Sequence, residues 1–322
     1  MPCFHPLKAY RSLEGGIQFH NPYSDIDNSF PIPCRQCTGC RQEYARQWAM
    51  RLTLEREMWD KSTFITLTYD NDHLPEHNTL VKSDFQKFMK RLRKKRLTGK
   101  PEENLIISNR LYPIRFFHAG EYGEKFGRPH YHAILFNCDF ADRESLAGHK
   151  TLTTSETLNK IWGMGINNSI GDVTFQSTAY VAGYIQKKIN GPMEKHINPE
   201  TGLRHYEIMT ADGEIITRQK EYATMSRNPG IAGNWLSKYW KDVYPSDTIH
   251  INGMEMKPPK YFDRVFEHDL IQFPQGEAII TDLKEQRIED AKQYAHLRTP
   301  EALAYLEKTH KAKMAIFKRK KL

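Results

Sequence analysis

Apolar residues recur at helical spacing in several stretches of the chain. Trp48, Leu52 and Trp59 follow one another at intervals of four and seven residues, which is typical of one face of an amphipathic helix. Ser83 precedes an apolar stripe that begins at Phe85, so it resembles a helix N-cap. The pattern predicts helices over residues 41–60, 83–96, 153–162, 177–189 and 234–240, and from residue 299 to the end of the chain.

Other stretches alternate between apolar and polar or β-branched residues, with a period of two. Residues 62–69 read Ser-Thr-Phe-Ile-Thr-Leu-Thr-Tyr, a composition that favours a strand. Further strands are predicted over residues 111–119 and 130–136, and residues 165–175 are predicted to be extended. Residues 195–226 resemble an inserted hairpin, because residues 198–202 and 211–213 carry turn formers.

Antiparallel strands interleaved with helices indicate an α+β fold. The first forty residues are rich in turn formers and cysteine, and periodicity weakens again after Pro245. We therefore divide the chain into a cysteine-rich N-terminal segment with a helix (1–60), a central domain (61–245) and a C-terminal extension with a basic helical tail (246–322).

The composition and net charge of the chain limit which binding partners are expected. Apolar residues make up 39% of the 322 residues and charged residues 27%, which is typical of a soluble globular protein. No stretch is long and apolar enough to span a bilayer, and the N-terminus lacks the pattern of a secretory signal. We expect no membrane partner and a location in the cytoplasm of the cell that makes the protein. The net charge of +8 favours a polyanionic partner such as nucleic acid.

Two histidines share one face of a predicted strand. His130 and His132 lie two residues apart, so their side chains project to the same side. Glu121 ends the preceding strand, and an antiparallel hairpin would bring it near His130; Glu124, in the connecting loop, is the weaker candidate. Two imidazoles and a carboxylate form a site for a divalent cation. The same set also suits iron in oxygen chemistry, and a short His-x-His pattern also arises by chance.

A predicted helix carries the second group of chemically active residues. Tyr180, Tyr184 and Lys187 are spaced i, i+4 and i+7, so they share one helix face. A phenol has a pKa of about 10 and is a weak nucleophile at neutral pH. It attacks phosphorus when a metal ion polarises the phosphate, and a lysine one turn away would offset the developing charge. Taken alone, the pattern fits an ordinary amphipathic helix equally well.

The N-terminal segment contains a cysteine cluster. Cys34, Cys37 and Cys40 are three residues apart, and Cys3 is available as a fourth ligand, with His5 as its alternate. In a reducing compartment such a cluster favours a structural zinc site over disulfides. An iron–sulfur cluster and free thiols are the alternatives. Cys138, in contrast, is expected to be an ordinary buried residue.

Basic residues near these motifs are candidates for DNA contacts. They are Arg128 and Lys188, beside the histidine and tyrosine motifs, and Lys90, Arg91 and Arg93, in the basic run 90–96. Such side chains track phosphates in DNA-binding proteins. A solvated helix face explains the basic run and the tail 318–321 equally well.

The motifs together resemble the HUH endonuclease superfamily of rolling-circle replication initiators. The resemblance is closest to initiators of small single-stranded DNA phages, the microviruses and gokushovirus-like phages. It rests on the segments 64–69 (Phe-Ile-Thr-Leu-Thr-Tyr), 128–132 (Arg-Pro-His-Tyr-His) and 180–187 (Tyr-x-x-x-Tyr-x-x-Lys), in the family order.

The resemblance implies a central five-stranded antiparallel sheet flanked by helices. It implies Mg²⁺ or Mn²⁺ at His130 and His132, with Glu121 as the acidic partner. It also implies that Tyr184 or Tyr180 makes a covalent link to DNA, assisted by Lys187. The predicted function is nicking and religation of one strand at a replication origin.

The alternatives to this function are a relaxase or transposase of the same superfamily, and a non-catalytic DNA-binding protein. The chain has no Gly-x-x-x-x-Gly-Lys-[Ser/Thr] motif, so a helicase of the bacterial host would unwind the duplex. A host DNA polymerase would extend the nicked strand.

Overall fold

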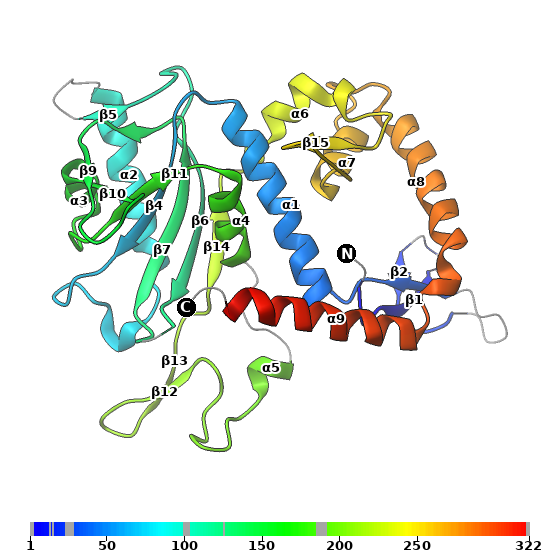
Figure 1. The fold of residues 1–322 in the computed structure, drawn as a ribbon, viewed down its shortest axis with the longest axis horizontal. Coiled ribbons are helices and arrows are strands. Elements are labelled where there is room, and N and C mark those ends of the chain that lie inside the picture. The colour runs from blue at the N-terminus through cyan, green and yellow to red at the C-terminus, as the bar shows by residue number, and fades with distance from the viewer. Residues whose placement is uncertain are drawn as a thin grey trace. The chain divides into compact units, whose positions relative to one another are not determined.

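The computed structural model describes residues 3–12, 14, 16–22, 29–98, 104–124, 126–184 and 192–319 (Figure 1). The chain forms two compact units. We name Gln47–Val265 the sheet unit, and Met1–Arg46 together with Phe266–Leu322 the terminal unit. No helix within the described ranges is long and apolar enough to cross a membrane.

A seven-stranded antiparallel sheet forms the centre of the sheet unit (Figure 1), with the order β14-β6-β7-β4-β11-β10-β9. The antiparallel α+β prediction is confirmed, but the expected number of five strands is wrong. Beyond β11 the sheet continues into β10 and β9, which have three residues each. Such short strands contain too few positions to show a period of two. The strands are β4 (Ser62–Thr68), β6 (Arg115–Tyr122), β7 (Pro129–Phe136), β9 (Arg143–Ser145), β10 (Thr153–Ser155), β11 (Ser169–Asp172) and β14 (Tyr222–Met225).

Helices cover both faces of this sheet. On one face, α2 (Lys82–Thr98) and α3 (Glu156–Trp162) pack over the main core. On the other face, α4 (Phe175–Tyr184) contacts β6 and β7, and Trp48 of α1 (Thr38–Glu57) lies 5.0 Å from the Phe117 ring, centroid to centroid. The core contains the alternate β4 and β7 residues Ile65, Leu67, Tyr131, Ala133 and Leu135.

The predicted helix at 153–162 begins three residues later, because residues 153–155 form β10. Ser155 caps it: its hydroxyl accepts a hydrogen bond from the Leu158 N–H at 3.1 Å. Gly163 ends it with a left-handed φ of 68°, which a residue without Cβ adopts readily. The helix therefore has a capping residue at each end, Ser155 at the start and Gly163 at the finish.

A buried ion pair joins α1 to β6. Arg115 Nε donates to Glu55 Oε1 at 2.6 Å, and the two side chains are 5% and 1% exposed. Glu55 also accepts from Trp59 Nε1 at 3.0 Å and from the Ala232 N–H at 2.6 Å. A buried carboxylate is tolerated when its lone pairs are satisfied in this way.

The remaining elements of the sheet unit lie around the sheet and the helices that cover it. The predicted inserted hairpin is confirmed in β12 and β13, and the turn at 198–202 closes with a hydrogen bond from the Gly202 N–H to the Asn198 carbonyl at 2.8 Å. These elements are β5 (Leu105–Ile106), β8 (Asp139–Phe140), α5 (Pro192–Lys195), β12 (Glu207–Met209), β13 (Ile215–Thr217), α6 (Gly233–Tyr239), β15 (Ile249–Ile251), β16 (Met254–Met256) and most of α7 (Lys260–His268).

The terminal unit combines the two ends of the chain. Its strands β1 (Leu7–Arg11), β2 (Ile17–Gln18) and β3 (Phe30–Ile32) form a small antiparallel sheet. Its helices are the start of α1, the end of α7, α8 (Gly276–Gln293) and α9 (Pro300–Arg319). The helix predicted from residue 299 onward is therefore confirmed. The buried apolar side chains of this unit include Ala9, Phe266, Phe273, Ile280 and Leu303.

Candidate functional site

Two neighbouring strands bring Glu121, His130 and His132 together. In the β6–β7 pairing, Glu121 lies opposite His130, and Ala119 lies opposite His132. The single oxygen Glu121 Oε1 is 2.7 Å from His130 Nε2 and 3.2 Å from His132 Nε2. Sequence reasoning expected this hairpin register, and the structure has it. Glu124 is exposed and lies outside the group. We name the three residues the imidazole–carboxylate site.

Hydrogen bonds orient both imidazoles from behind. The Nδ1 atom of His132 is 3.0 Å from the Thr66 hydroxyl, and the Nδ1 atom of His130 is 3.2 Å from the Arg128 carbonyl oxygen. Each ring therefore directs its Nε2 atom toward Glu121. Metal-binding histidines are held in this way in proteins, with the second nitrogen bonded to an oxygen. The donor set of two imidazoles and one carboxylate, with its outer partners, therefore fits a divalent cation such as Mn²⁺.

The tyrosine helix lies over this site. The ring of Tyr180 in α4 is 5.7 Å from the ring of His132, centroid to centroid, in an edge-to-face arrangement. Val181 and Ala182 are buried against the sheet, whereas Tyr180 is 47% exposed. The hydroxyl of Thr178 is 3.2 Å from that of Thr53, which ties α4 to α1. A phenol that is both accessible and adjacent to a potential metal ligand can meet a phosphate there.

The other residues of the predicted tyrosine motif are only partly described. The backbone of Tyr184 belongs to the last turn of α4, one helical turn beyond Tyr180. The side chain of Tyr184 and both Lys187 and Lys188 lie outside the described part of the chain. Their roles stay predictions.

Two residues of β4 belong to this site, and sequence reasoning assigned them no role. Phe64 stacks on His132 with ring centroids 5.8 Å apart and meets the edge of Tyr180 at 6.3 Å. Thr66 lies directly opposite His132 in the β4–β7 pairing. The signal was available in the alternation of β4, because residues 64, 66 and 68 share the face of the histidines. The alternation does not show that β4 pairs with β7, and this pairing is what brings Phe64 and Thr66 to the histidines.

The predicted DNA-binding arginines make hydrogen bonds inside the sheet unit. Arg128 donates to the Asn71 side chain at 2.9 Å and to the Tyr69 carbonyl at 3.1 Å. Arg91 donates to the Ile161 and Trp162 carbonyls at the end of α3, and Arg93 donates to the Ile114 carbonyl at 3.1 Å. Lys90 is exposed. Whether these side chains also contact DNA stays a prediction.

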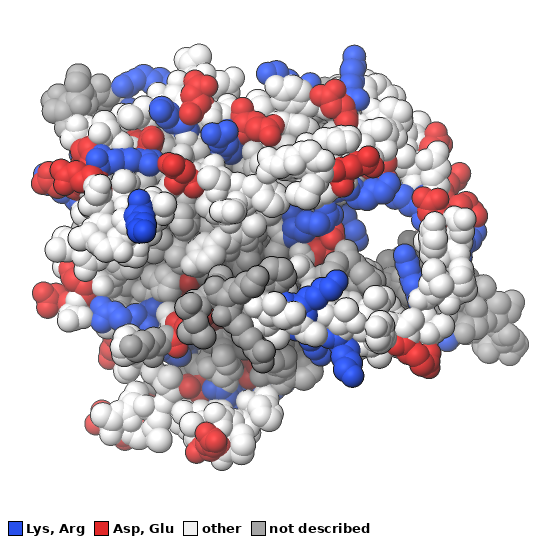
Figure 2. All heavy atoms as spheres, in the orientation of Figure 1, with Lys and Arg blue, Asp and Glu red and all other residues white. Residues whose placement is uncertain are grey.

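Charge is not segregated on the surface that Figure 2 shows. Basic and acidic side chains are interspersed there over the described residues. The net charge of +8 therefore does not collect into one basic patch on this face, and charge alone does not mark a DNA path.

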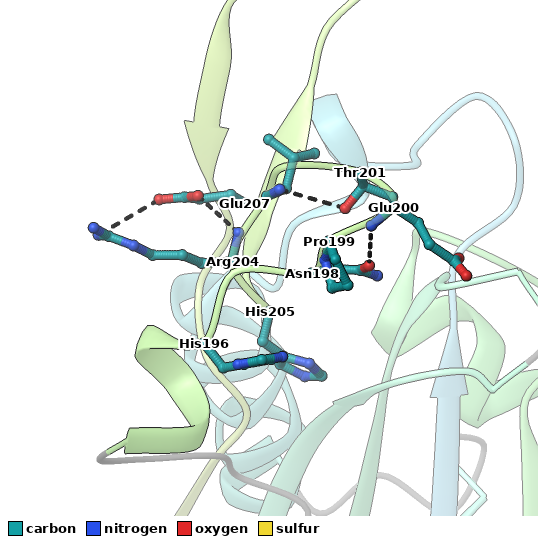
Figure 3. Close-up of a pocket in the computed structure, with 9 residues that line it drawn as sticks. His196, Asn198, Pro199, Glu200, Thr201, Arg204, His205 and Glu207 are labelled. Carbon is teal, nitrogen blue, oxygen red and sulfur yellow. Dashed lines mark hydrogen bonds and ion pairs between the residues drawn. The ribbon is translucent and has the colours of Figure 1, made fainter.

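The hairpin insertion contains an open hollow of about 720 Å³ (Figure 3). The hollow shares no lining residue with the imidazole–carboxylate site. His196 and His205 lie close together on one side of it, and Arg204 forms an ion pair with Glu207 at 3.7 Å on another. Asn198 Oδ1 accepts the Glu200 N–H at 2.9 Å. The polar groups of this loop mostly satisfy one another, and none of the predicted site residues lines the hollow.

The cysteine cluster is a second group with metal-ligand geometry. The Sγ atoms of Cys3, Cys34, Cys37 and Cys40 all lie within 4.8 Å of one another, and all four residues are free cysteines. We name this group the thiolate site. His5, the alternate ligand, instead pairs with Glu307 at 2.9 Å. Burial raises the pKa of Cys37, but N–H donors from Cys40 and Phe4 outweigh it and lower that pKa to about 6.

The sheet unit is thus an antiparallel α+β domain in which a histidine–glutamate group lies under a tyrosine helix. The family model of the replication-associated protein ORF2/G2P matches residues 62–189, the segment from β4 to just beyond α4. No solved structure is significantly similar to the chain.

Phage proteins are similar over most of the chain. The replication-associated protein VP4 of Bdellovibrio phage phiMH2K is 32% identical over 269 residues, which is 81% of this chain and 76% of that protein. The replication-associated protein ORF2 of Spiroplasma virus 4 is 29% identical over 318 residues, 91% of this chain and 87% of its own length. The replication-associated protein ORF4 of Chlamydia phage 1 is 29% identical over 73% of this chain and 53% of its own length. The chain belongs to the replication-associated protein ORF2/G2P family.

Proposed function

We propose that this protein initiates phage DNA replication as an HUH-type nickase, which cuts one strand at an origin and later rejoins it. The observation that carries the proposal is the position of Tyr180. Its ring packs against His132, whose Nε2 atom points to the carboxylate that also meets His130. Family membership supports the same role in replication.

The chemistry is a transesterification at phosphorus. The phenolic oxygen of Tyr180 or Tyr184 attacks a backbone phosphate, and a new bond forms between tyrosine and the 5′-phosphate. The bond from phosphorus to the 3′-oxygen breaks, and that oxygen leaves with a proton as a free 3′-hydroxyl. Attack of a 3′-hydroxyl on the phosphotyrosine reverses these steps and rejoins the strand. No oxidant or energy source is consumed.

Mg²⁺ or Mn²⁺, held by Glu121, His130 and His132, would supply charge stabilisation at the phosphate when bound. Residues of the chain orient the imidazoles and the tyrosine. Thr66 and the Arg128 carbonyl hold the two rings in orientation, and Phe64 contacts both His132 and Tyr180. Because β6 and β7 are paired in an antiparallel ladder over eight residue pairs, the three side chains stand on a rigid frame, as metal-assisted catalysis needs.

Two tyrosines one turn apart allow two successive reactions. While one holds the 5′-phosphotyrosine link, the other attacks the regenerated origin after a round of synthesis. The free 3′-hydroxyl primes synthesis by a host polymerase, a host helicase separates the strands, and the reaction takes place in the cytoplasm of a bacterial cell.

A covalent adduct tests the proposal. Wild-type protein is incubated with Mg²⁺ or Mn²⁺ and with labelled single-stranded oligonucleotides that tile the replicon encoding the chain, and products are separated on a denaturing gel. The same assay is run on Tyr180→Phe, Tyr184→Phe and the double variant. Tyr305→Phe is the matched control, because Tyr305 is an exposed tyrosine of α9.

We expect a protein–DNA band in the wild type and the control and none in the double variant, with the linked residue identified by peptide mapping. A band that is lost in one single variant, Tyr180→Phe or Tyr184→Phe, would reduce the mechanism to one nucleophile. If DNA binds but no oligonucleotide in the set gives a band with either metal, the protein is a non-catalytic DNA-binding protein. Cleavage at a transfer origin or transposon end instead would identify a relaxase or a transposase.

A further inference from the structure

The four sulfurs of the thiolate site have the spacing of ligands around one metal ion. The Sγ atoms of Cys34 and Cys40 are 4.0 Å apart, and those of Cys3 and Cys37 are 3.9 Å apart. Four thiolates at 2.3 Å from a tetrahedral Zn²⁺ are separated by about 3.8 Å. A disulfide would need about 2.05 Å between two sulfurs, and an iron–sulfur cluster would need room for several iron and sulfide ions between the ligands.

Backbone N–H groups point at these sulfurs. Cys34 N–H donates to Cys3 Sγ at 3.3 Å, Cys37 N–H donates to Cys34 Sγ at 3.3 Å, and Cys40 N–H donates to Cys37 Sγ at 3.5 Å. A fourth donor is the Phe4 N–H, 3.4 Å from Cys37 Sγ. Metal-bound cysteines must be deprotonated, and donors aimed at sulfur stabilise that charge. Three of the four sulfurs, those of Cys3, Cys34 and Cys37, therefore accept N–H groups that stabilise a thiolate.

The residues next to Cys3 hold the last helix of the chain. The ring of Phe4, which is 5% exposed, lies 5.6 Å from the ring of His310 in α9. His5 Nε2 lies 2.9 Å from Glu307 Oε2, and Lys311 Nζ lies 2.8 Å from the other oxygen of that carboxylate. Phe4 and His5 directly follow a cysteine of the thiolate site, so anything that fixes Cys3 also fixes the contact with α9.

We propose that Cys3, Cys34, Cys37 and Cys40 bind one structural Zn²⁺, and that this ion docks α9 onto the N-terminal segment through Phe4 and His5. The segment has little structure of its own to hold Cys3, because β1, β2 and β3 contain five, two and three residues. Binding free energy at a thiolate site becomes folding free energy for such a segment. Zinc occupancy therefore determines whether α9 is anchored.

The first experiment measures metal content. Full-length protein is purified under reducing conditions without chelator, and zinc and iron are quantified per chain. The measurement is repeated with His130→Ala, His132→Ala protein, because imidazoles also bind zinc. Cys34→Ser, Cys37→Ser protein tests the thiolate site, and Cys138→Ala, which removes a buried cysteine outside it, is the matched control.

We expect one zinc per chain in the wild type, the histidine variant and the Cys138→Ala control, and none in the double serine variant. Replacement by Co²⁺ should give the intense near-ultraviolet absorption of tetrahedral cobalt thiolates. Protein that carries no tightly bound metal, or carries iron in place of zinc, would overturn the assignment.

The second experiment tests the docking of α9 by amide hydrogen exchange. Removal of zinc from the wild type should speed exchange of residues 303–315 at least tenfold, whereas β4 and β7 keep their protection. Those strands show whether the rest of the chain is still folded. Phe4→Ala, His310→Ala protein should exchange equally fast in α9 and still bind one zinc. Unchanged exchange of α9 after the metal is removed would overturn the coupling.

Discussion

The imidazole–carboxylate site and the thiolate site are both metal-ligand groups, but they are built in opposite ways. The first stands on β6 and β7, two eight-residue strands in the middle of a seven-stranded sheet. The second joins a loop near the N-terminus to the first turn of α1, beside strands of two to five residues. The first site stands on long paired strands, whereas the second lies among loops and short strands.

This difference predicts different consequences of losing a ligand. The sheet around the histidines is stabilised by its own core and hydrogen bonds, so removal of a ligand should cost chemistry and little stability. The short strands around the cysteines bury few apolar side chains, so removal of a ligand should cost stability first. Donor type follows the same division: imidazole and carboxylate suit an open reactive ion, and four thiolates suit a closed structural one.

The largest effect is expected from His132→Ala. Nicking should fall by roughly 10³-fold or more, because charge stabilisation at the phosphate is usually the largest single contribution to such catalysis. Binding of single-stranded DNA, measured by fluorescence anisotropy, should change little, and the melting temperature should stay within a few degrees of the wild type. Equal cleavage by wild-type protein in excess chelator would contradict a metal role for this site.

Loss of the thiolate site should produce the reverse pattern. Cys34→Ser, Cys37→Ser is expected to lower the melting temperature of the terminal unit by about 10 °C or more, because the free energy of metal binding no longer adds to folding. Differential scanning calorimetry checks this, and Cys138→Ala separates it from the general effect of losing a thiol. A melting curve that does not move would show that the terminal unit folds without the site.

A smaller effect is expected from Thr66→Val, which removes the hydroxyl at His132 Nδ1 and keeps the β-branched shape. Affinity for Mn²⁺, measured by electron paramagnetic resonance of the free ion, should fall by about 10- to 100-fold. Losses of this size are typical when a residue that hydrogen-bonds to a metal ligand is removed. Thr66→Ser should restore it. Thr68→Val is the matched control on the same strand face, because that hydroxyl donates to the Asn167 carbonyl. Equal affinities in all four proteins would exclude a positioning role for Thr66.

The smallest effect concerns His118, a histidine of β6 that does not belong to the imidazole–carboxylate site. Burial, and then the nearby His132, lower the pKa of His118 from 6.5 to about 3. Between these values the unfolded chain takes up a proton that the folded chain does not. Stability should therefore fall with falling pH, by up to about 1.4 kcal/mol per pH unit from this residue.

Urea unfolding at pH 7 and pH 5.5 measures this contribution. His118→Gln should make the difference between the two pH values smaller, whereas His149→Gln, at an exposed position, should leave it as in the wild type. If His118→Gln keeps the full pH dependence, the acid sensitivity comes from other groups.

Local periodicity was enough to place the histidines, Glu121 and Tyr180 on their elements. Alternation placed His130 and His132 on one strand face, and the short connection from residue 123 to 128 returned β7 beside β6, so the register of Glu121 with His130 could be predicted. Helical spacing placed Tyr180 on α4 with Val181 turned inward. These are near-neighbour geometries, which depend on a few consecutive dihedral angles.

Tertiary structure decided what depends on distant segments. Only the pairing of β4 with β7 places Thr66 behind His132, and only the packing of α2 turns Arg91 and Arg93 toward carbonyl groups of α3 and of the segment before β6. The two extra strands β9 and β10 extend the sheet beyond β11, and each forms only by pairing with another segment of the chain. Likewise, α9 meets Phe4 through contacts more than 300 residues apart in sequence. Short-range patterns carry no information about such contacts, because they are selected by packing and hydrogen bonding of the whole chain.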